Sequence, residues 1–243
     1  MRLKMNKKVL IAIVVVVILA LIGGIVFAVT RKPKEKNDEK EDKKVTSSQN
    51  NEVVETAKPE NENKIEENIN EEEKNMYSTG LHHAAIVIKD YGTIKLELDA
   101  DVAPITVQNF AKLVNEGFYV GLTFHRIIDG FMIQVGDPEG TGFGGSSENI
   151  KGEFLANGVK NTISHVRGTI SMARSQAYNS ASSQFFIVHE DSTFLNGQYA
   201  GFGKVTSGIE IVDKICEDTP VEDDNGTVLK KNQPVIEKIT MED

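Results

Sequence analysis

Short segments in which every second residue is apolar follow one another closely from residue 81 to residue 243. In residues 93–98, Ile94, Leu96 and Leu98 alternate with polar residues, which is typical of a β-strand with one buried face. The same pattern predicts strands at residues 84–89, 123–128, 131–135, 168–172, 184–189, 201–205 and 234–241. Strands of this kind must pair, because an unpaired strand edge exposes backbone hydrogen-bonding groups.

Two segments have a helical period instead. Pro104 suits the first position of a helix, apolar residues then recur about every 3.6 residues, and Gly117 is typical of a helix end. Residues 208–216 predict a second helix. Many short strands with two helices favour a mainly β fold: a closed antiparallel barrel whose ends the helices cover. We expect one such domain at residues 81–243.

Residues 9–29 contain no charged side chain. At about 1.5 Å per residue, a helix of this length spans the roughly 30 Å hydrocarbon layer of a membrane. We therefore expect residues 1–30 to be an uncleaved transmembrane anchor; a cleaved secretory signal peptide is the alternative. Basic residues lie on both sides of this run, so their count alone barely decides the orientation. A span so close to the start of the chain, with a free amino group and a basic cluster before it, usually keeps the N-terminus in the cytoplasm. We therefore expect a single-pass protein of the cell membrane, with the C-terminal domain outside the cell.

Residues 31–80 are rich in Glu, Lys and Asn, with only scattered apolar side chains. Such a segment cannot bury enough apolar surface to offset the entropy lost on ordering. The sequence therefore predicts a disordered, charged linker, with at most a transient helix near residues 65–73.

The composition excludes several classes of function. Cys216 is the only cysteine, so neither a disulfide within one chain nor a cysteine metal cluster can form, and its apolar neighbours indicate a small buried side chain. The chain has 27 Lys and Arg against 36 Asp and Glu, which disfavours nucleic acid as a partner. No pattern in the sequence predicts a metal or a cofactor.

The run Phe124-His125-Arg126-Ile127-Ile128 places a guanidinium in an apolar strand. Removing that charge from water is costly unless it is paired or meets a ligand, so Arg126 is either part of an ion pair or part of a site. Strand periodicity places Met132 and Gln134 on one face, and likewise Gln184 and Phe186. These strands are therefore predicted to line a common groove.

Three stretches carry a specific resemblance: FHRIIDGFMIQVGD, GTISMARSQ and SSQFFIVHEDSTFLNGQYAGFG. In this order they resemble the cyclophilin family of peptidyl-prolyl cis-trans isomerases, and the similarity covers residues 82–241. The resemblance implies an eight-stranded barrel with two capping helices, a substrate groove on its outer surface, proline-containing polypeptides as substrates and no cofactor.

Carried over by position, the resemblance assigns roles to individual residues. It implies a catalytic role for Arg126 together with Gln134. The implied proline pocket and flanking substrate contacts are Phe131, Met132, Ala173, Arg174, Gln184, Phe186, Phe194, Leu195 and Tyr199. Phe194 and Tyr199 stand where many eukaryotic members have Trp and His; they resemble bacterial members and imply weak cyclosporin binding.

The sequence thus predicts a membrane-anchored isomerase that assists the folding of proteins at the outer side of the membrane. A noncatalytic proline-binding adaptor and a chaperone are the alternatives. Arg126 favours the enzyme, because a protein that only binds proline gains less from a donor that acts in the transition state.

Overall fold

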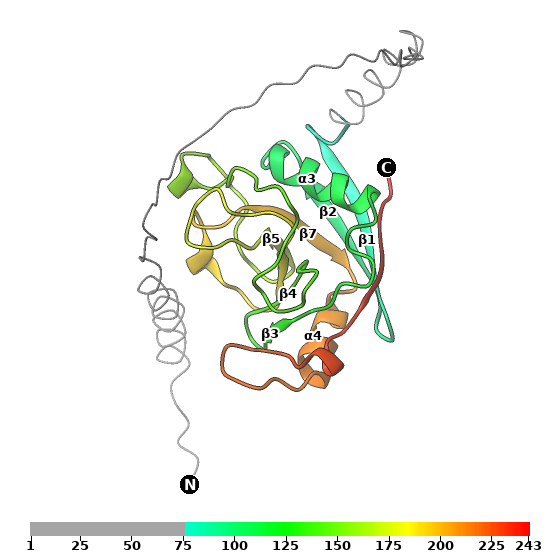
Figure 1. The fold of residues 1–243 in the computed structure, drawn as a ribbon. Coiled ribbons are helices and arrows are strands. Elements are labelled where there is room, and N and C mark those ends of the chain that lie inside the picture. Colours follow the sequence, from blue (N-terminus) through cyan, green and yellow to red (C-terminus); the bar gives the residue numbers. More distant parts are fainter. Residues whose placement is uncertain (1–75) are drawn as a thin grey trace, which may run out of the picture. The chain divides into compact units, whose positions relative to one another are not determined.

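The computed structural model describes residues 76–243 (Figure 1). The predicted anchor, residues 1–30, and nearly all of the predicted linker, residues 31–80, lie outside the described residues. Within residues 76–243, no helix is both long enough and apolar enough to cross a membrane.

Eight strands in the described segment form one antiparallel sheet in the order β3-β4-β6-β5-β7-β2-β1-β8. The strands are β1 (Leu81–Ile88), β2 (Gly92–Asp99), β3 (Arg126–Ile128), β4 (Met132–Val135), β5 (Thr169–Met172), β6 (Phe185–Val188), β7 (Gly201–Ser207) and β8 (Ile236–Met241). Each lies where the alternating pattern predicts a strand. Two starts differ by three residues: β3 begins later than the predicted segment 123–128, and β1 begins earlier than the predicted segment 84–89.

The prediction of a closed barrel was wrong. Strands β3 and β8 are the two edges of the sheet, and among the described residues only isolated backbone contacts connect the segments beside them. Thr123 forms a bridge with Val235, and the Phe124 N–H donates to the carbonyl oxygen of Pro234 at 2.9 Å. Proline has no N–H to donate in return, so a regular ladder cannot continue at this position.

Both predicted helices are present, and they lie at opposite ends of the sheet (Figure 1). Helix α3 (Pro104–Asn115) has proline in its first turn and ends before Gly117, as predicted. Its first backbone N–H groups donate to the buried carboxylate of Glu153, which takes the place of a capping side chain. Helix α4 (Ile209–Asp218) begins one residue later than predicted and ends two residues later.

The apolar side of the sheet packs into one main core. Ile94, Leu96 and Leu98 of β2 are fully buried, which confirms the predicted inward face. Phe110 of α3 lies 5.5 Å, between ring centroids, from Phe185 of β6. Burying each large apolar side chain contributes about 1.5–3 kcal/mol, so this core is the main favourable term in the folding of the domain.

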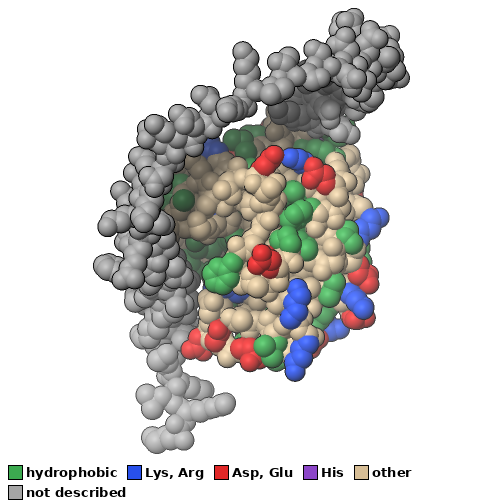
Figure 2. All heavy atoms as spheres, in the orientation of Figure 1, with side chains coloured by type: hydrophobic (Ala, Val, Ile, Leu, Met, Phe, Trp, Pro, Cys, Tyr) green, Lys and Arg blue, Asp and Glu red, His purple; other side chains and the backbone are tan. Residues whose placement is uncertain are grey.

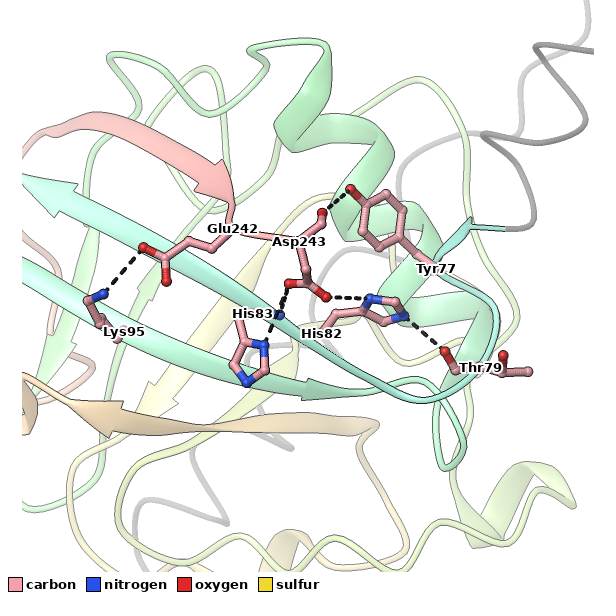
Figure 3. A network of polar contacts seen from close by, with 7 residues as sticks. All are labelled: Tyr77, Thr79, His82, His83, Lys95, Glu242 and Asp243. Carbon is pink, nitrogen blue, oxygen red and sulfur yellow. Dashed lines mark hydrogen bonds and ion pairs between the residues drawn. The ribbon is translucent and has the colours of Figure 1, made fainter.

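The last residues of the chain are tied to β1 (Figure 3). One carboxylate oxygen of Asp243 lies 2.9 Å from Nδ1 of His82, and the other accepts the backbone N–H of His83. The Tyr77 hydroxyl donates to the Asp243 carbonyl oxygen at 3.3 Å. These bonds extend the β1–β8 pairing beyond the end of β8.

The face drawn in Figure 2 has Lys and Arg side chains interspersed with Asp and Glu. This face presents no continuous basic surface, in keeping with the excess of acidic residues in the sequence. Such a surface does not attract a phosphate backbone.

Candidate functional site

The candidate site lies on three neighbouring strands, β3, β4 and β6. Arg126 of β3 is directly opposite Gln134 of β4, and Gln134 is opposite Phe186 of β6. Residues that are paired across antiparallel strands project from the same face of the sheet. The register therefore places a cation, an amide and an aromatic ring in one row, as the strand periodicity predicts.

The guanidinium of Arg126 is held from two sides. Its Nε donates to the carbonyl oxygen of Asn225 at 2.9 Å, and one Nη donates to Oδ1 of the same residue at 3.2 Å. The other Nη donates to Oε1 of Gln134 at 3.2 Å and lies 3.9 Å from Sδ of Met132. A guanidinium has five N–H groups, so these contacts fix its plane while leaving donor capacity toward solvent.

Burial lowers the pKa of Arg126, whereas the nearby Tyr199 and Asp223 side chains raise it. An arginine side chain nevertheless stays protonated in proteins at neutral pH. The site therefore presents a fixed, partly desolvated cation, a state in which hydrogen bonds to a ligand are stronger than in water.

The polar row continues from Gln134 into a loop. Nε2 of Gln134 donates to Oε1 of Gln184 at 2.8 Å. Nε2 of Gln184 donates in turn to the carbonyl oxygens of Gly142 and Gly144, at 3.1 and 2.7 Å. These bonds fix the orientation of both amides, so the chain from Arg126 to the loop is one connected network.

Beside the polar row lies a second apolar cluster, separate from the main core. Met132, Phe186, Val188 and Leu195 are its buried members, and Ile128, Phe131, Ala173 and Tyr199 pack against them. Phe194, which is 49% exposed, lies against Phe131 with ring centroids 5.6 Å apart. Every residue assigned to the proline pocket by resemblance is therefore in this cluster or in contact with it.

Arg174 differs from the other predicted site residues. Its guanidinium lies over the rings of Phe154, Tyr178 and Tyr199, at 4.9, 5.2 and 4.7 Å from their centroids. Its Nε also donates to the carbonyl oxygen of Gln198 at 2.9 Å. Cation–π contacts of this kind stabilise the local packing, so the charge of Arg174 is already engaged within the protein.

Sequence reasoning missed two residues that support this network. Asn225 holds Arg126 although 99 positions separate them in the chain. Asp137 accepts hydrogen bonds from the backbone of the loop that carries Gly142. An Asn-Gly pair and an Asp before a glycine-rich stretch are turn signals, but they do not reveal which distant side chain the turn meets.

Two buried histidines lie near the site, His125 and His165. His165 lies parallel to Phe186, with ring centroids 6.1 Å apart, and its Nε2 is 2.9 Å from Oγ of Ser171. Burial lowers the pKa of His165, which favours the neutral ring. His125 is also buried; burial lowers its pKa, whereas Asp137 and the backbone of Thr123 raise it.

The described domain matches a known protein family in sequence and in structure. Residues 83–241 match the family model described as "Cyclophilin type peptidyl-prolyl cis-trans isomerase/CLD". A solved cyclophilin-type isomerase from Cryptosporidium parvum superimposes with a TM-score of 0.59 and 32% sequence identity, covering 68% of this chain and 99% of that one. The chain belongs to the cyclophilin family. Because nearly all of the solved protein is covered, this fold forms as a unit of its own.

Relatives with assigned names point to the same activity. A probable peptidyl-prolyl cis-trans isomerase of Brucella suis is 45% identical over 164 residues, which are 64% of this chain and 80% of that protein. Peptidyl-prolyl cis-trans isomerase B of Bacillus subtilis is 46% identical over 145 residues, 60% of this chain and 92% of its own length. The protein is therefore a peptidyl-prolyl cis-trans isomerase.

Proposed function

We propose that Arg126 is the catalytic residue of this isomerase and that it acts on the prolyl nitrogen. Rotating an Xaa-Pro bond breaks amide resonance, against a barrier of about 18–20 kcal/mol. In the twisted transition state the nitrogen regains a lone pair, which a guanidinium N–H can then bond. A hydrogen bond made only in the transition state lowers the barrier without stabilising the substrate.

The observation that carries this proposal is the fixed guanidinium beside an apolar cluster. Asn225 and Gln134 bind Arg126 before any substrate arrives, so little reorganisation is needed when the amide twists. Phe131, Met132 and Phe186 provide apolar surface for the proline ring, together with Leu195. Gln134 could bind the flanking backbone while its amide stays oriented by Gln184.

The energy required is moderate. Uncatalysed isomerisation takes tens to hundreds of seconds, so reaching milliseconds needs a factor of about 10⁴ to 10⁵, or roughly 5.5–7 kcal/mol. One charged hydrogen bond contributes about 1.5–3 kcal/mol of this. Holding the ring in the pocket while the preceding residues contact the surface around Ala173, Arg174 and Gln184 would supply the remainder.

The test of this mechanism uses residues 76–243 and a peptide containing Ala-Pro-Phe. Arg126→Ala should lower kcat/KM at least about tenfold, which corresponds to about 1.4 kcal/mol. Arg126→Lys should also be impaired, because an ammonium does not reproduce the planar guanidinium. Arg167→Ala is the matched control: it also replaces an arginine by alanine, at a residue that forms a salt bridge with Asp213, and it should leave the rate near wild type. Wild-type rates in both Arg126 variants would exclude the assigned mechanism.

The two rival functions predict that replacing Arg126 causes no loss of function. An adaptor that only holds proline segments would keep its partner affinity in Arg126→Ala, since the apolar cluster is unchanged. A chaperone acting through other surfaces would still suppress aggregation. We expect instead that the wild type accelerates the refolding of a protein limited by proline isomerisation, and that Arg126→Ala loses this acceleration while it retains most peptide binding.

We also propose that the enzyme works at the outer side of the cell membrane, held there by residues 1–30 and spaced from it by residues 31–80. The support is the uncharged run 9–29 and the basic residues before it. Proteins that fold after crossing the membrane would then be its substrates.

A further inference from the structure

Three different metal-binding side chains converge outside the site described above. Asp129 lies in the turn after β3, His189 follows β6, and Cys216 is in α4. One carboxylate oxygen, one imidazole nitrogen and the sulfur lie within 4.8 Å of one another. Oδ1 of Asp129 is 3.4 Å from Nδ1 of His189.

The imidazole is oriented in the way that metal-binding histidines usually are. Nε2 of His189 lies 3.0 Å from Oδ1 of Asp213, and Oδ2 of Asp213 accepts from Arg167 at 2.7 Å. Nδ1 of His189 accepts the Gly130 N–H at 2.9 Å, so the ring proton is on Nε2, which donates it to Asp213. The lone pair of His189 is therefore on Nδ1, the nitrogen that lies 3.4 Å from Asp129. A histidine ligand that donates its second nitrogen to a carboxylate is typical of metal sites.

The surroundings favour a dication. Asp223 and Asp224 line the same surface pocket as Asp129 and Cys216. The side chain of Asp129 is 82% exposed, which gives an ion a path from solvent. The guanidinium of Arg167 donates to Asp213 and to the carbonyl oxygen of His189, so its charge is paired within the protein.

We propose that Asp129, His189 and Cys216 bind a divalent transition metal ion of the zinc type, with water completing four-fold coordination. One oxygen, one nitrogen and one sulfur donor suit zinc, whereas magnesium and calcium prefer oxygen donors alone. This proposal reverses the expectation, based on a single cysteine, that the protein has no metal site.

Binding requires two local changes. Ligand atoms around tetrahedral zinc lie about 3.3–3.8 Å apart. Asp129 and His189 already have this separation, at 3.4 Å, so the change needed is an approach of the Cys216 sulfur by up to about 1 Å. The Gly130 N–H, which donates to Nδ1 of His189 at 2.9 Å, must release that nitrogen. Gly130 is in the turn between β3 and β4 with φ 75°, a conformation in which glycine is free to adjust. The proton of the Cys216 thiol leaves to solvent as the metal–sulfur bond forms.

The experiment uses residues 76–243 without a histidine tag, freed of metal by a chelator and titrated with cobalt(II). Because Cys216 is the only cysteine, a thiolate-to-cobalt charge-transfer band can arise only from this site. Added zinc should remove the band, and competition against a zinc indicator then gives the affinity. Asp129→Asn and Cys216→Ser should each weaken zinc binding at least about tenfold. Asp218→Asn, an exposed acid on the same helix, should bind as wild type.

The outcomes separate this site from adventitious binding. Metal bound by His82, His83 and Asp243 would give no sulfur band, and a titration without that band would overturn the proposal. Unchanged zinc affinity in Asp129→Asn would overturn it as well; this exposed substitution does not threaten folding. In an NMR titration, the Gly130 amide signal should move when zinc is added to the wild type and stay in place in Cys216→Ser.

Discussion

Asp137 provides a direct test of how the loop beside the site is held. Its carboxylate is buried and accepts the backbone N–H groups of Glu139 at 2.8 Å, of Thr141 at 2.8 Å and of Gly142 at 2.6 Å. Burial alone would raise the pKa of this group. Hydrogen bonds from these backbone amides and that of Gly144 outweigh the effect of burial and lower the pKa from 3.8 to about 2.

The size of the effect follows from the two pKa values of Asp137. At about 1.4 kcal/mol per pH unit, the lowering corresponds to on the order of 2 kcal/mol of stability. Because the folded pKa is below the unfolded one, this contribution is complete above about pH 5. It is lost as the pH falls from about 4 toward 2, when the carboxylate becomes protonated in the folded state.

Asp137→Asn should therefore unfold more easily by on the order of 2 kcal/mol at pH 7, and the difference from wild type should shrink below about pH 4. The variant should also lower kcat/KM, because the loop carbonyls that orient Gln184 are no longer fixed. Urea unfolding of residues 76–243 at several pH values measures the first effect, with Asp218→Asn as the matched control. A stability difference that is absent at pH 7, or that persists unchanged to pH 2.5, would refute the reasoning.

Two further predictions concern the inhibitor and the membrane. Phe194→Trp should bind cyclosporin more tightly by roughly 1 kcal/mol, because an indole N–H adds one hydrogen-bond donor, and equal inhibition constants in the two proteins would count against this. The full-length chain should stay with membranes through high salt and carbonate, since screening charge does not undo apolar burial. Protease added to intact cells, with any wall removed, should release a compact fragment; resistance until lysis would place the domain inside, and a mature N-terminus near Arg31 would indicate a cleaved signal peptide.

Much of the fold could be predicted from local patterns, because a half-buried strand requires alternation over only a few residues. Ile94, Leu96 and Leu98 show this alternation. The helix between Pro104 and Gly117 was predictable for a similar reason, because its start and end signals are also local. Barrel closure could not be predicted, because it depends on a pairing between segments about a hundred residues apart. A strand pattern does not indicate where the hydrogen-bonded ladder ends.

The residues of the candidate site also divide into those that the sequence could predict and those that it could not. Arg126 could be recognised as a candidate site residue, because a guanidinium in an apolar strand is costly to desolvate unless it is paired or meets a ligand. Gln134 could be recognised because strand periodicity places it on a predictable face. The partners that orient them were not recognisable: Asn225 and Asp137 are turn residues whose function depends on tertiary contact. The same limit applies to Arg174, whose sequence position does not reveal the three aromatic rings around it.

The incomplete barrel and the fixed arginine have a common structural origin. Arg126 lies on an edge strand, and its outer neighbour is the segment around Thr227, which forms an isolated bridge with it. The Ile127 N–H donates to the carbonyl oxygen of Gly226 at 2.8 Å. Gly226 has φ 79°, and an added Cβ there would collide with the carbonyl oxygen of Ile127, so only glycine lets the turn approach so closely.

That turn also brings the preceding residue, Asn225, to the guanidinium with both a backbone and a side-chain oxygen. A regular strand paired with β3 at this edge would bond the backbone N–H and C=O groups of β3. The side chains of that added strand would alternate between the two faces of the sheet, and its carbonyl oxygens would be used in the ladder. A tight turn presents both kinds of acceptor to one side chain. The edge position thus gives Arg126 acceptors that hold its plane, which a site relying on one oriented cation requires.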